Sequence, residues 1–600
     1  MECPKCQFDN REGAKFCNEC GHKFQLTCPE CGSINRVDSK FCDECGSNLN
    51  FPIKQTPKDL SFDEKLTKIQ KYLPKGLTEK ILSQRNRIEG ERKQVTVMFC
   101  DMEGFTSLVE ILGPEEAYNM MDQIYEILIH KVHKYEGTVN EMTGDGVMAL
   151  FGAPIAIEDA PQRAIRSAMS IHKGIAKFSD KIRNKDLIQL KMRIGIHTGP
   201  VVVGTLGNDL RVEFKAVGDT VNIASRLENL AAPGSTYITE DTVNLTEGLF
   251  QFEALGEKEI KGKKERLHIY RVVASSSRRT RFDVRAEKGL TPFIGRDREV
   301  ELLLDSFGRA KSGRGQAFSI MAEAGAGKSR ILYELRKSLA NEDIIFLEGK
   351  CLSYRGGISY HSIIDILKSN FNISDNDKQQ IIAEKINTGL KKLRIDKKTI
   401  LPYLLELMSV ENSGIERIHL SPEAKKAKIV DTFIRLVIKG SEIRPLVMAI
   451  EDMHWIDKSS EDCLSKLLDS ISGSSVFLLF TYRPEFIHTW GSRSYHNQMI
   501  LNRLSNRETI EMTSYLLGTK DISIELSELI LGKSEGNPFF IEEFISSLTK
   551  LEVIMKKDGK IIVQNLNEIK IPSTIQDIIM ARVDALPENT KNVLQTGSVI

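Results

Sequence analysis

Four Cys-x-x-Cys pairs fill the first 46 residues and leave that segment few ways to fold. Its two halves, "CPKCQFDNREGAKFCNECG" and "CPECGSINRVDSKFCDECG", share their spacing, the phenylalanine before the third cysteine and the glycine after the fourth. Thiolates two residues apart can hold one tetrahedral zinc ion together with a second such pair, and four thiolates leave no open position for catalysis. We therefore expect two tandem zinc ribbons over residues 1–48, with two structural Zn²⁺ ions. The predicted ligands are Cys3, Cys6, Cys17, Cys20, Cys28, Cys31, Cys42 and Cys45.

The composition of the 600 residues is typical of folded protein, with 41% hydrophobic and 28% charged residues. Lys and Arg number 83 against 82 Asp and Glu, so the overall charge favours neither a nucleic acid nor a membrane as a partner. The apolar runs are too short to span a bilayer, and the N-terminal segment has no apolar signal region. We therefore expect a cytoplasmic chain, in which paired cysteines bind metal. The last residues are predicted to be helical, which indicates that the natural chain continues.

Changes in composition divide the rest of the chain. Residues 49–91 are polar at first and then follow a helical apolar pattern, which predicts a linker and a stalk helix. Residues 92–273 predict a β-α-β-β-α-β order, the ferredoxin-like arrangement. A second linker is expected at 274–290, and residues 291–600 alternate strands and helices as α/β proteins do. The expected fold class is multidomain α/β and α+β.

Two acids in the middle domain lie where predicted strands end. Asp101 ends "VTVMFCDM", and Asp145 lies at the tip of the hairpin in "GTVNEMTGDGVMALFG". Neighbouring central strands of this fold bring the two ends together, and converging carboxylates favour Mg²⁺ or Mn²⁺. The turn with Gly104, Phe105 and Thr106 opens a helix whose free backbone N–H groups can bind phosphate. The sequence therefore predicts a nucleotide and metal site.

A third feature lies on the helix that begins at "GDTVN". Asn222 and Arg226 are four residues apart and share one face of that helix. An amide and a guanidinium on one face could orient a sugar and neutralise the charge of a reacting phosphoryl group. For such a pair alone, a solvated helix edge is the simpler interpretation, and the other motifs in the same domain favour the catalytic one.

These motifs together resemble a known family. "FCDMEGFTSL", "TGDGVMALFG", "MRIGIHTGPVVVG" and "VGDTVNIASRLE" resemble the class III adenylyl/guanylyl cyclase catalytic domain, and the resemblance covers residues 92–272. It implies that two acids hold two metal ions, which lower the pKa of the ribose 3′-hydroxyl and neutralise the triphosphate. It also implies a homodimer with two sites, since family enzymes build each site from two domains.

The resemblance assigns roles residue by residue. Asp101 and Asp145 would be the metal ligands, Asn222 would orient the ribose and Arg226 would stabilise the transition state. Lys261, in "EIKGKKERLHIY", would bind the polyphosphate.

Base recognition is where the chain departs from the adenylyl cyclase pattern. Glu141 stands where adenylyl cyclases of this class usually carry Lys and guanylyl cyclases carry Glu, and Lys215 stands where adenylyl cyclases carry Asp or Thr. We expect the two side chains to lie beside each other at the purine. Their hydrogen bonds suit guanine slightly better, and the prevalence of cyclic AMP among bacterial members favours ATP. GTP is the alternative substrate, and a salt bridge outside the pocket is the alternative role of the pair.

The C-terminal half carries a second nucleotide motif. "SIMAEAGAGKSRILYEL" predicts a strand, a phosphate-binding loop and a helix, with Ala322 where the loop pattern has its first glycine. The predicted ATP ligands are Gly325, Gly327, Lys328 and Ser329. "PLVMAIEDMHWID" predicts a buried strand that ends in the acids Glu451 and Asp452, which would serve the metal and the attacking water. Arg483 ends another buried strand and is the predicted sensor of the nucleotide.

This half resembles the signal-transducing branch of AAA-like ATPases from residue 292 onward. The combination of zinc ribbons, cyclase and ATPase resembles bacterial multidomain cyclases, and its order is similar to that of animal soluble adenylyl cyclase. It implies a signalling enzyme regulated by its ATPase half, with ATP or GTP as substrate. Two alternatives remain: a signalling scaffold with a non-catalytic cyclase domain, and a C-terminal nucleotide switch with little turnover. A protein partner of the zinc ribbons or the C-terminal region is expected.

Overall fold

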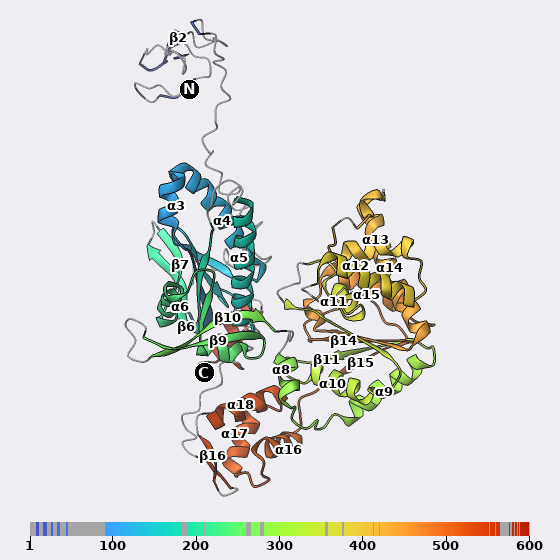
Figure 1. The fold of residues 1–600 in the computed structure, drawn as a ribbon. Coiled ribbons are helices and arrows are strands. Elements are labelled where there is room, and N and C mark those ends of the chain that lie inside the picture. The colour runs from blue at the N-terminus through green and yellow to red at the C-terminus, as the bar shows by residue number, and fades with distance from the viewer. Residues whose placement is uncertain are drawn as a thin grey trace. The chain divides into compact units, whose positions relative to one another are not determined.

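The computed structural model of the chain divides into two compact units, Met1–Leu73 and Pro74–Ile600. In the first unit, the short strands β1 (Leu26–Thr27) and β2 (Ile34–Asn35) pair antiparallel (Figure 1). The predicted stalk helix within 49–91 lies outside the described residues. The structure describes the chain apart from residues 1–5, 7, 11–15, 21–25, 28–32, 36–43, 46–90, 183–188, 209–210, 260–265, 277–280, 354–357, 375–376, 412, 419, 551–552, 558–559, 564–574, 577–578, 581–582, 585, 587 and 599–600.

An eight-stranded sheet forms the middle domain and confirms the predicted ferredoxin-like order at its start. The strand order is β4-β5-β3-β6-β8-β10-β9, and β7 also pairs with β6. The central strand β3 is antiparallel to both β5 and β6. The strands are β3 (Glu91–Met102), β4 (Thr138–Met142), β5 (Val147–Phe151), β6 (Met192–Asn208), β7 (Arg211–Val217), β8 (Thr236–Thr239), β9 (Phe250–Lys258) and β10 (Leu267–Ser275).

The two faces of this sheet are covered by different helices. Side chains alternate along a strand, so the even-numbered residues of β3 from Met98 onward pack into the core that holds α4 (Pro114–Lys134) and α5 (Ala160–Ile182). The odd-numbered Val95 and Val97 pack on the opposite face with α6 (Asp219–Leu230). The odd-numbered side chains of β3 therefore point to the face of the sheet that α6 covers, which we call the α6 face.

The predicted helix after Asp101 is two helices. α3 (Phe105–Leu112) ends at Gly113, which has a φ of 80°, and α4 starts at Pro114. Proline lacks an N–H group and is tolerated in the first turn of a helix, whereas glycine adopts a positive φ without strain. The Gly-Pro pair therefore ends one helix and starts the next.

The segment predicted as the second linker, 274–290, contains regular structure. Strand β10 runs to Ser275, and α8 (Arg281–Lys288) follows it. Val284 packs into the core of the middle domain, while Arg285 forms ion pairs with Glu542 and Glu543 of the C-terminal half. The Ser- and Arg-rich composition indicated a solvated linker, but an apolar residue beside a charged one gives this helix a separate contact on each side.

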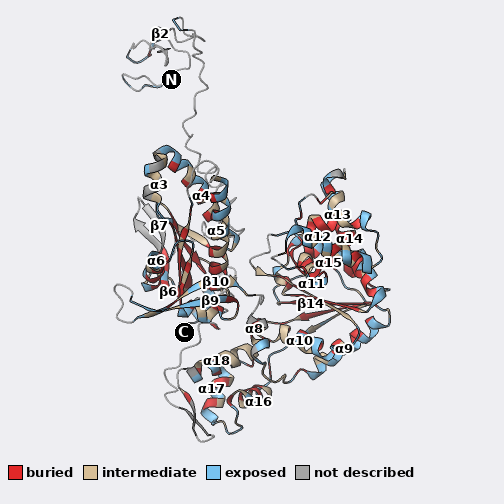
Figure 2. Ribbon diagram, in the orientation of Figure 1, coloured by how far each residue is buried: buried red, intermediate tan, exposed pale blue. Residues whose placement is uncertain are grey.

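A five-stranded parallel sheet forms the centre of the C-terminal half, in the order β12-β13-β14-β11-β15. Figure 2 shows the central strand β14 buried, and all residues of β13 and β14 are buried. Strands buried on both faces need helices on both sides. The strands are β11 (Gln316–Met321), β12 (Ile345–Lys350), β13 (Leu446–Glu451), β14 (Val476–Tyr482) and β15 (His496–Ile500).

Helices cover both faces of this sheet, and a smaller helical group follows it. Around the sheet lie α9 (Asp297–Lys311), α10 (Lys328–Ser338), α11 (His361–Asn370), α12 (Gln379–Lys392), α13 (Lys397–Leu407), α14 (Pro422–Ile443) and α15 (Lys458–Ser470). The later group has its own apolar core. The elements from this group to the end of the described chain are α16 (Asn506–Leu517), α17 (Ile524–Ser534), α18 (Pro538–Lys550), β16 (Ile554–Lys557), β17 (Lys560–Val563) and α20 (Glu588–Gly597). Three short helices lie earlier in the chain: α7 (Glu240–Thr246), η2 (Ile415–Arg417) and η3 (Met453–Trp455).

Candidate functional site

The end of β3 and the tip of the β4–β5 hairpin bring the two predicted metal acids together. The carboxyl groups of Asp101 and Asp145 lie close enough together for Asp145 to raise the pKa of Asp101. Gly146 makes this approach possible, because a Cβ atom there would lie 1.9 Å from the carbonyl oxygen of Cys100. The Tyr125 hydroxyl of α4 donates a hydrogen bond to the Gly144 carbonyl at 2.7 Å and holds the tip of the hairpin.

The electrostatics of this pair suit a cation. Burial raises the pKa of Asp101 to about 7, and the neighbouring Asp145 acts in the same direction. Two carboxylates this close repel each other unless a proton or a positive ion lies between them. Hard oxygen donors favour Mg²⁺ or Mn²⁺. The residues present therefore fit a divalent ion.

The α6 face also carries the predicted catalytic pair. Asp101 is odd-numbered on β3 and therefore lies on the face that Val97 shares with α6. α6 packs directly on β6, and this close approach requires a glycine at position 195, because a Cβ atom there would lie 2.2 Å from the Glu228 nitrogen. Asn222 is exposed and Arg226 half-buried, and within the described residues neither forms a hydrogen bond or an ion pair. One chain therefore carries both the two metal acids and the Asn222–Arg226 pair, and no contact among the described residues connects them.

The predicted phosphate-binding turn has the expected backbone. Gly104 has a φ of 72° and precedes the first residue of α3, Phe105. The first N–H groups of a helix have no partner inside it and can donate to an anion. Thr106 follows in the first turn, and its side chain lies outside the described residues.

The two residues predicted to recognise the base lie on different strands of the sheet. Glu141 is exposed on the edge strand β4, opposite Met148 of β5. Lys215 lies on β7, opposite Gly204 of β6, and its side chain is not described. Strands β5, β3 and β6 lie between them, which is a separation of roughly 19 Å at the usual strand spacing. Because the Lys215 side chain lies outside the described residues, the expected neighbourhood of the two side chains stays a prediction. Lys261 lies outside the described residues.

The phosphate-binding loop of the C-terminal half lies between β11 and α10. Gly325 and Gly327 have φ values of 78° and 103°, and Gly327 precedes α10. Lys328 is buried, and its ammonium donates to the carbonyl oxygens of Ala322 and Glu323, each at 2.9 Å. Burial lowers the pKa of Lys328, and Asp452 opposes that effect. The loop therefore keeps its shape although Ala322 replaces a glycine.

The two acids after β13 have different neighbours. The Glu451 carboxylate lies 3.6 Å from the ammonium of Lys350 on the neighbouring strand. Asp452 has a φ of 56°, which turns the chain at the end of the strand, and its charge acts on Lys328. Asp452 is thus the acid beside the phosphate-binding loop.

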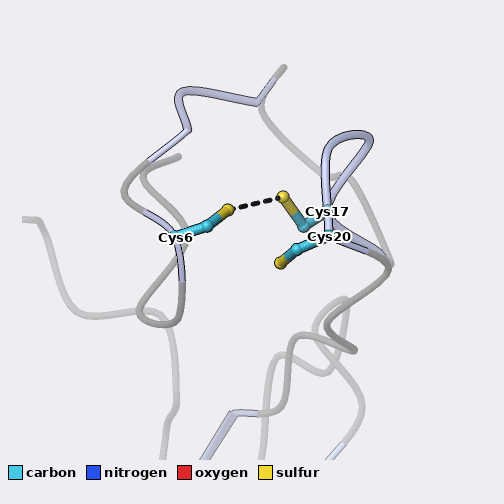
Figure 3. A group of neighbouring side chains, drawn as sticks. All are labelled: Cys6, Cys17 and Cys20. Atoms are coloured by element: carbon cyan, nitrogen blue, oxygen red, sulfur yellow. Dashed lines mark hydrogen bonds between the residues drawn. The ribbon is translucent and has the colours of Figure 1, made fainter.

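Three cysteines of the first ribbon converge as the sequence predicts (Figure 3). The sulfur atoms of Cys6, Cys17 and Cys20 lie within 4.8 Å of one another. Although desolvation opposes it, hydrogen bonds from the Cys20 backbone, Asn10 and the Glu19 backbone lower the pKa of Cys17 to about 6. A thiolate is the form that binds zinc. Cys45 is described and exposed. The predicted ligands Cys3, Cys28, Cys31 and Cys42 lie outside the described residues.

Sequence reasoning missed several residues that shape these sites. Asn537 donates from its amide to the Ala324 carbonyl at 2.8 Å, so the helical group after the sheet contacts the phosphate-binding loop. The motif "GNPFF" was a signal for this contact. Gly146 and Tyr125 gave no such signal, because their contacts exist only in the folded chain.

The comparisons with known families agree with these sites. Residues 3–46 match the family "Double zinc ribbon", 89–274 the "Adenylate and Guanylate cyclase catalytic domain" and 292–479 the "AAA ATPase domain". Residues 505–561 match a domain of unknown function. Among the described residues, no helix is both long and apolar enough to cross a membrane.

Two curated proteins of Rhizobium meliloti (strain 1021) are among the similar relatives. An uncharacterised protein is 25% identical over 459 residues, covering 76% of this chain and 44% of its own length. "Adenylate cyclase 1" is 33% identical over 207 residues, covering 34% of this chain and 31% of its own length. The chain thus spans less than half of either relative.

Two further similar proteins have names that indicate different nucleotide bases. Rat "Guanylate cyclase 2G" is 30% identical over 196 residues, covering 32% of this chain and 18% of its own length. The crystal structure of the adenylyl cyclase CyaB from P. aeruginosa is 30% identical, with a TM-score of 0.31, and the match covers 32% of this chain and 98% of that one. The matches to the three family models show that the chain carries an N-terminal double zinc ribbon, a class III nucleotide cyclase domain and a C-terminal AAA ATPase domain.

Proposed function

We propose that the chain is a cytoplasmic nucleotide cyclase that converts ATP to 3′,5′-cyclic AMP and pyrophosphate for signalling. The closeness of Asp101 and Asp145 carries this proposal, since it gives the cyclase domain a pair of carboxylates suited to a divalent ion. In the reaction the ribose 3′-oxygen loses its proton and bonds to the α-phosphorus, and the bond from that phosphorus to the bridging oxygen of pyrophosphate breaks. When bound, Mg²⁺ makes the hydroxyl more acidic and neutralises phosphate charge.

The protein residues bind and orient the nucleotide around that pair. The backbone at Gly104 and Phe105 offers N–H groups to the phosphates. Asn222 would orient the ribose and Arg226 would neutralise charge at the α-phosphate. Since no described contact of Asn222 or Arg226 reaches the acids of the same chain, we propose that a second copy supplies them, with Lys261, in a homodimer. The zinc ribbons would hold two structural Zn²⁺ ions.

The choice of base is proposed as ATP, with GTP as the alternative. Glu141 is exposed on the α6 face of an edge strand, which leaves it available to a purine held between two copies. If Glu141 from one copy and Lys215 from the other contact the base, Glu141→Lys shifts the ratio of kcat/KM for ATP and GTP by roughly tenfold or more, the scale of one or two mispaired hydrogen bonds. Steady-state rates with both nucleotides measure this ratio.

A charge reversal elsewhere controls for general electrostatics. Glu126 is exposed on α4, which covers the opposite face of the sheet, so Glu126→Lys should leave the ratio unchanged. An unchanged ratio in Glu141→Lys as well would remove Glu141 from the base site.

The C-terminal half is proposed to bind ATP and to regulate the cyclase. Lys328→Ala should weaken ATP binding there by at least roughly tenfold, because the loop loses the cation that faces the phosphates. Nucleotide titration of the full chain measures this, with the exposed Lys337→Ala on the last turn of α10 as the control. Wild-type affinity and wild-type cyclase regulation in Lys328→Ala would mean that the loop no longer binds nucleotide.

A further inference from the structure

The cavity at the phosphate-binding loop has a wall that comes from the cyclase domain. This cavity has a volume of about 730 Å³ and lies within the unit Pro74–Ile600. Its lining includes Gly325 to Arg330 of the ATPase domain and residues 155–159, the cyclase loop that follows β5. A nucleotide bound at the phosphate-binding loop would therefore face residues of both domains.

An ion pair joins the two domains inside this cavity. The Arg483 guanidinium donates to both carboxylate oxygens of Glu158, at 2.7 and 2.8 Å. The Arg483 side chain is 14% exposed and that of Glu158 is 25% exposed. A bidentate pair of this kind is among the stronger polar contacts in proteins, and partial burial strengthens it. Arg483, the predicted nucleotide sensor, is thus held by an acid of the cyclase domain.

The cyclase loop is held at two other points, so the ion pair does not fix it alone. The Ser353 hydroxyl donates to Asp159 at 3.0 Å. The Ala156 backbone N–H donates to Asp584 at 2.9 Å, and Asp584 also pairs with Lys93 at 2.7 Å. Removing the charge of Glu158 should therefore leave the loop in place.

Glu158 brings a negative charge to a cavity built to bind phosphates. Its charge acts on Lys328, as does that of Asp452. Glu485 also lines the cavity, but its carboxylate forms no hydrogen bond to Arg483 among the described contacts. Trp455 lines the cavity too, with its ring centroid 6.0 Å from the Arg483 guanidinium carbon.

We propose that Glu158 occupies the place of an anionic ligand at Arg483, and that the terminal phosphate of a nucleoside triphosphate competes with it. Binding a triphosphate then frees the cyclase loop from Arg483, whereas a diphosphate is too short to do so. This inference rests on the proposed nucleotide binding by the C-terminal half.

One strand connects the cyclase loop to the cyclase site. Strand β5 joins the loop to Asp145, since Val147 follows the hairpin tip and Phe151 precedes the loop. All five residues of β5 are buried. The exchange at Glu158 would therefore take place at one end of the strand that carries Asp145 at its other end.

Nucleotide binding to the full chain tests this proposal. Trp455 fluorescence reports occupancy of the cavity, and the probes are ADP and 3′-deoxy-ATP, a triphosphate that cannot be cyclised. Glu158→Gln should tighten 3′-deoxy-ATP binding roughly tenfold, the scale of one charge-assisted hydrogen-bonded contact, and leave ADP binding nearly unchanged. Glu485→Gln removes the same charge from the same cavity. Its effect on the affinities for 3′-deoxy-ATP and ADP should be much smaller than the effect of Glu158→Gln on the affinity for 3′-deoxy-ATP.

Three outcomes separate the claims. An unchanged or weaker affinity for 3′-deoxy-ATP in Glu158→Gln contradicts the competition. An equal gain for ADP and 3′-deoxy-ATP contradicts it too, because Glu158 would then repel any phosphate and not compete for Arg483. Binding by wild type that Lys328→Ala removes supports the proposed nucleotide site even if the Glu158 result fails, whereas no binding by wild type contradicts both.

Discussion

Asp101→Asn or Asp145→Asn should lower kcat for cyclic nucleotide formation by roughly a thousandfold or more, because metal-ion catalysis supplies several kcal/mol. An amide keeps the shape of the side chain but is a poor ligand for a divalent ion. The measurement is the initial rate of product formation at saturating Mg²⁺. Asp122→Asn, which makes the same change at an exposed position of α4, should keep full activity. Product formed at the wild-type rate by either site variant would contradict the metal assignment.

Asp101→Asn should keep or raise the stability of the folded chain although it lowers the catalytic rate. The pKa of Asp101 is about 7 in the folded chain, above the ordinary value of about 4 for an unfolded carboxyl group. The folded state therefore holds the proton more tightly, and stability falls as the pH rises from about 4 to about 7. Asp101→Asn removes this loss, so at pH 8 without metal its melting temperature should equal or exceed that of wild type. A large fall in melting temperature would mean that the variant loses activity by unfolding.

Mixing Asp101→Asn and Arg226→Ala chains should restore part of the activity that each lacks alone. If each site takes its acids from one chain and Asn222 and Arg226 from the other, a mixed dimer has one intact site and one that carries both changes. With random exchange, about half of the dimers are mixed and each has one of two sites, so the expected activity is roughly a quarter of wild type.

The control for this experiment is a mixture that cannot restore a site. When Asp101→Asn is mixed with Asp145→Asn, every site takes both acids from one chain and so carries one of the two changes, and the mixture should stay inactive. Rescue in that mixture, or none in the Asp101–Arg226 mixture at concentrations where dimers form, would contradict a site shared between two chains.

The sequence predicted most of the candidate site because its motifs pair chemical type with fixed position. Asp101 and Asp145 could be placed together because each follows a strand pattern that ends at the same edge of one sheet. The phosphate-binding loop was equally readable, since Gly327 and Lys328 stand between a buried strand and an amphipathic helix. Local pattern and chemistry agree at these positions, and the structure follows them.

Contacts between distant segments could not be predicted in this way. Glu158 and Arg483 are 325 residues apart, and neither stands in a pattern that names the other. The chemistry of Glu141 and Lys215 predicts that they act together, but the sequence pattern does not predict the three strands that lie between them in the sheet. The helix at Arg281–Lys288 was missed because it has only eight residues, too few for a clear apolar period.

The most direct test of this account is the product that the purified wild-type chain forms from ATP and from GTP with Mg²⁺. Chromatography against standards identifies the product, and pyrophosphate release gives the stoichiometry. We predict 3′,5′-cyclic AMP with one pyrophosphate per molecule, formed at a higher kcat/KM than cyclic GMP. Release of orthophosphate without any cyclic nucleotide, from a chain that is folded and binds both nucleotides, would contradict the central claim.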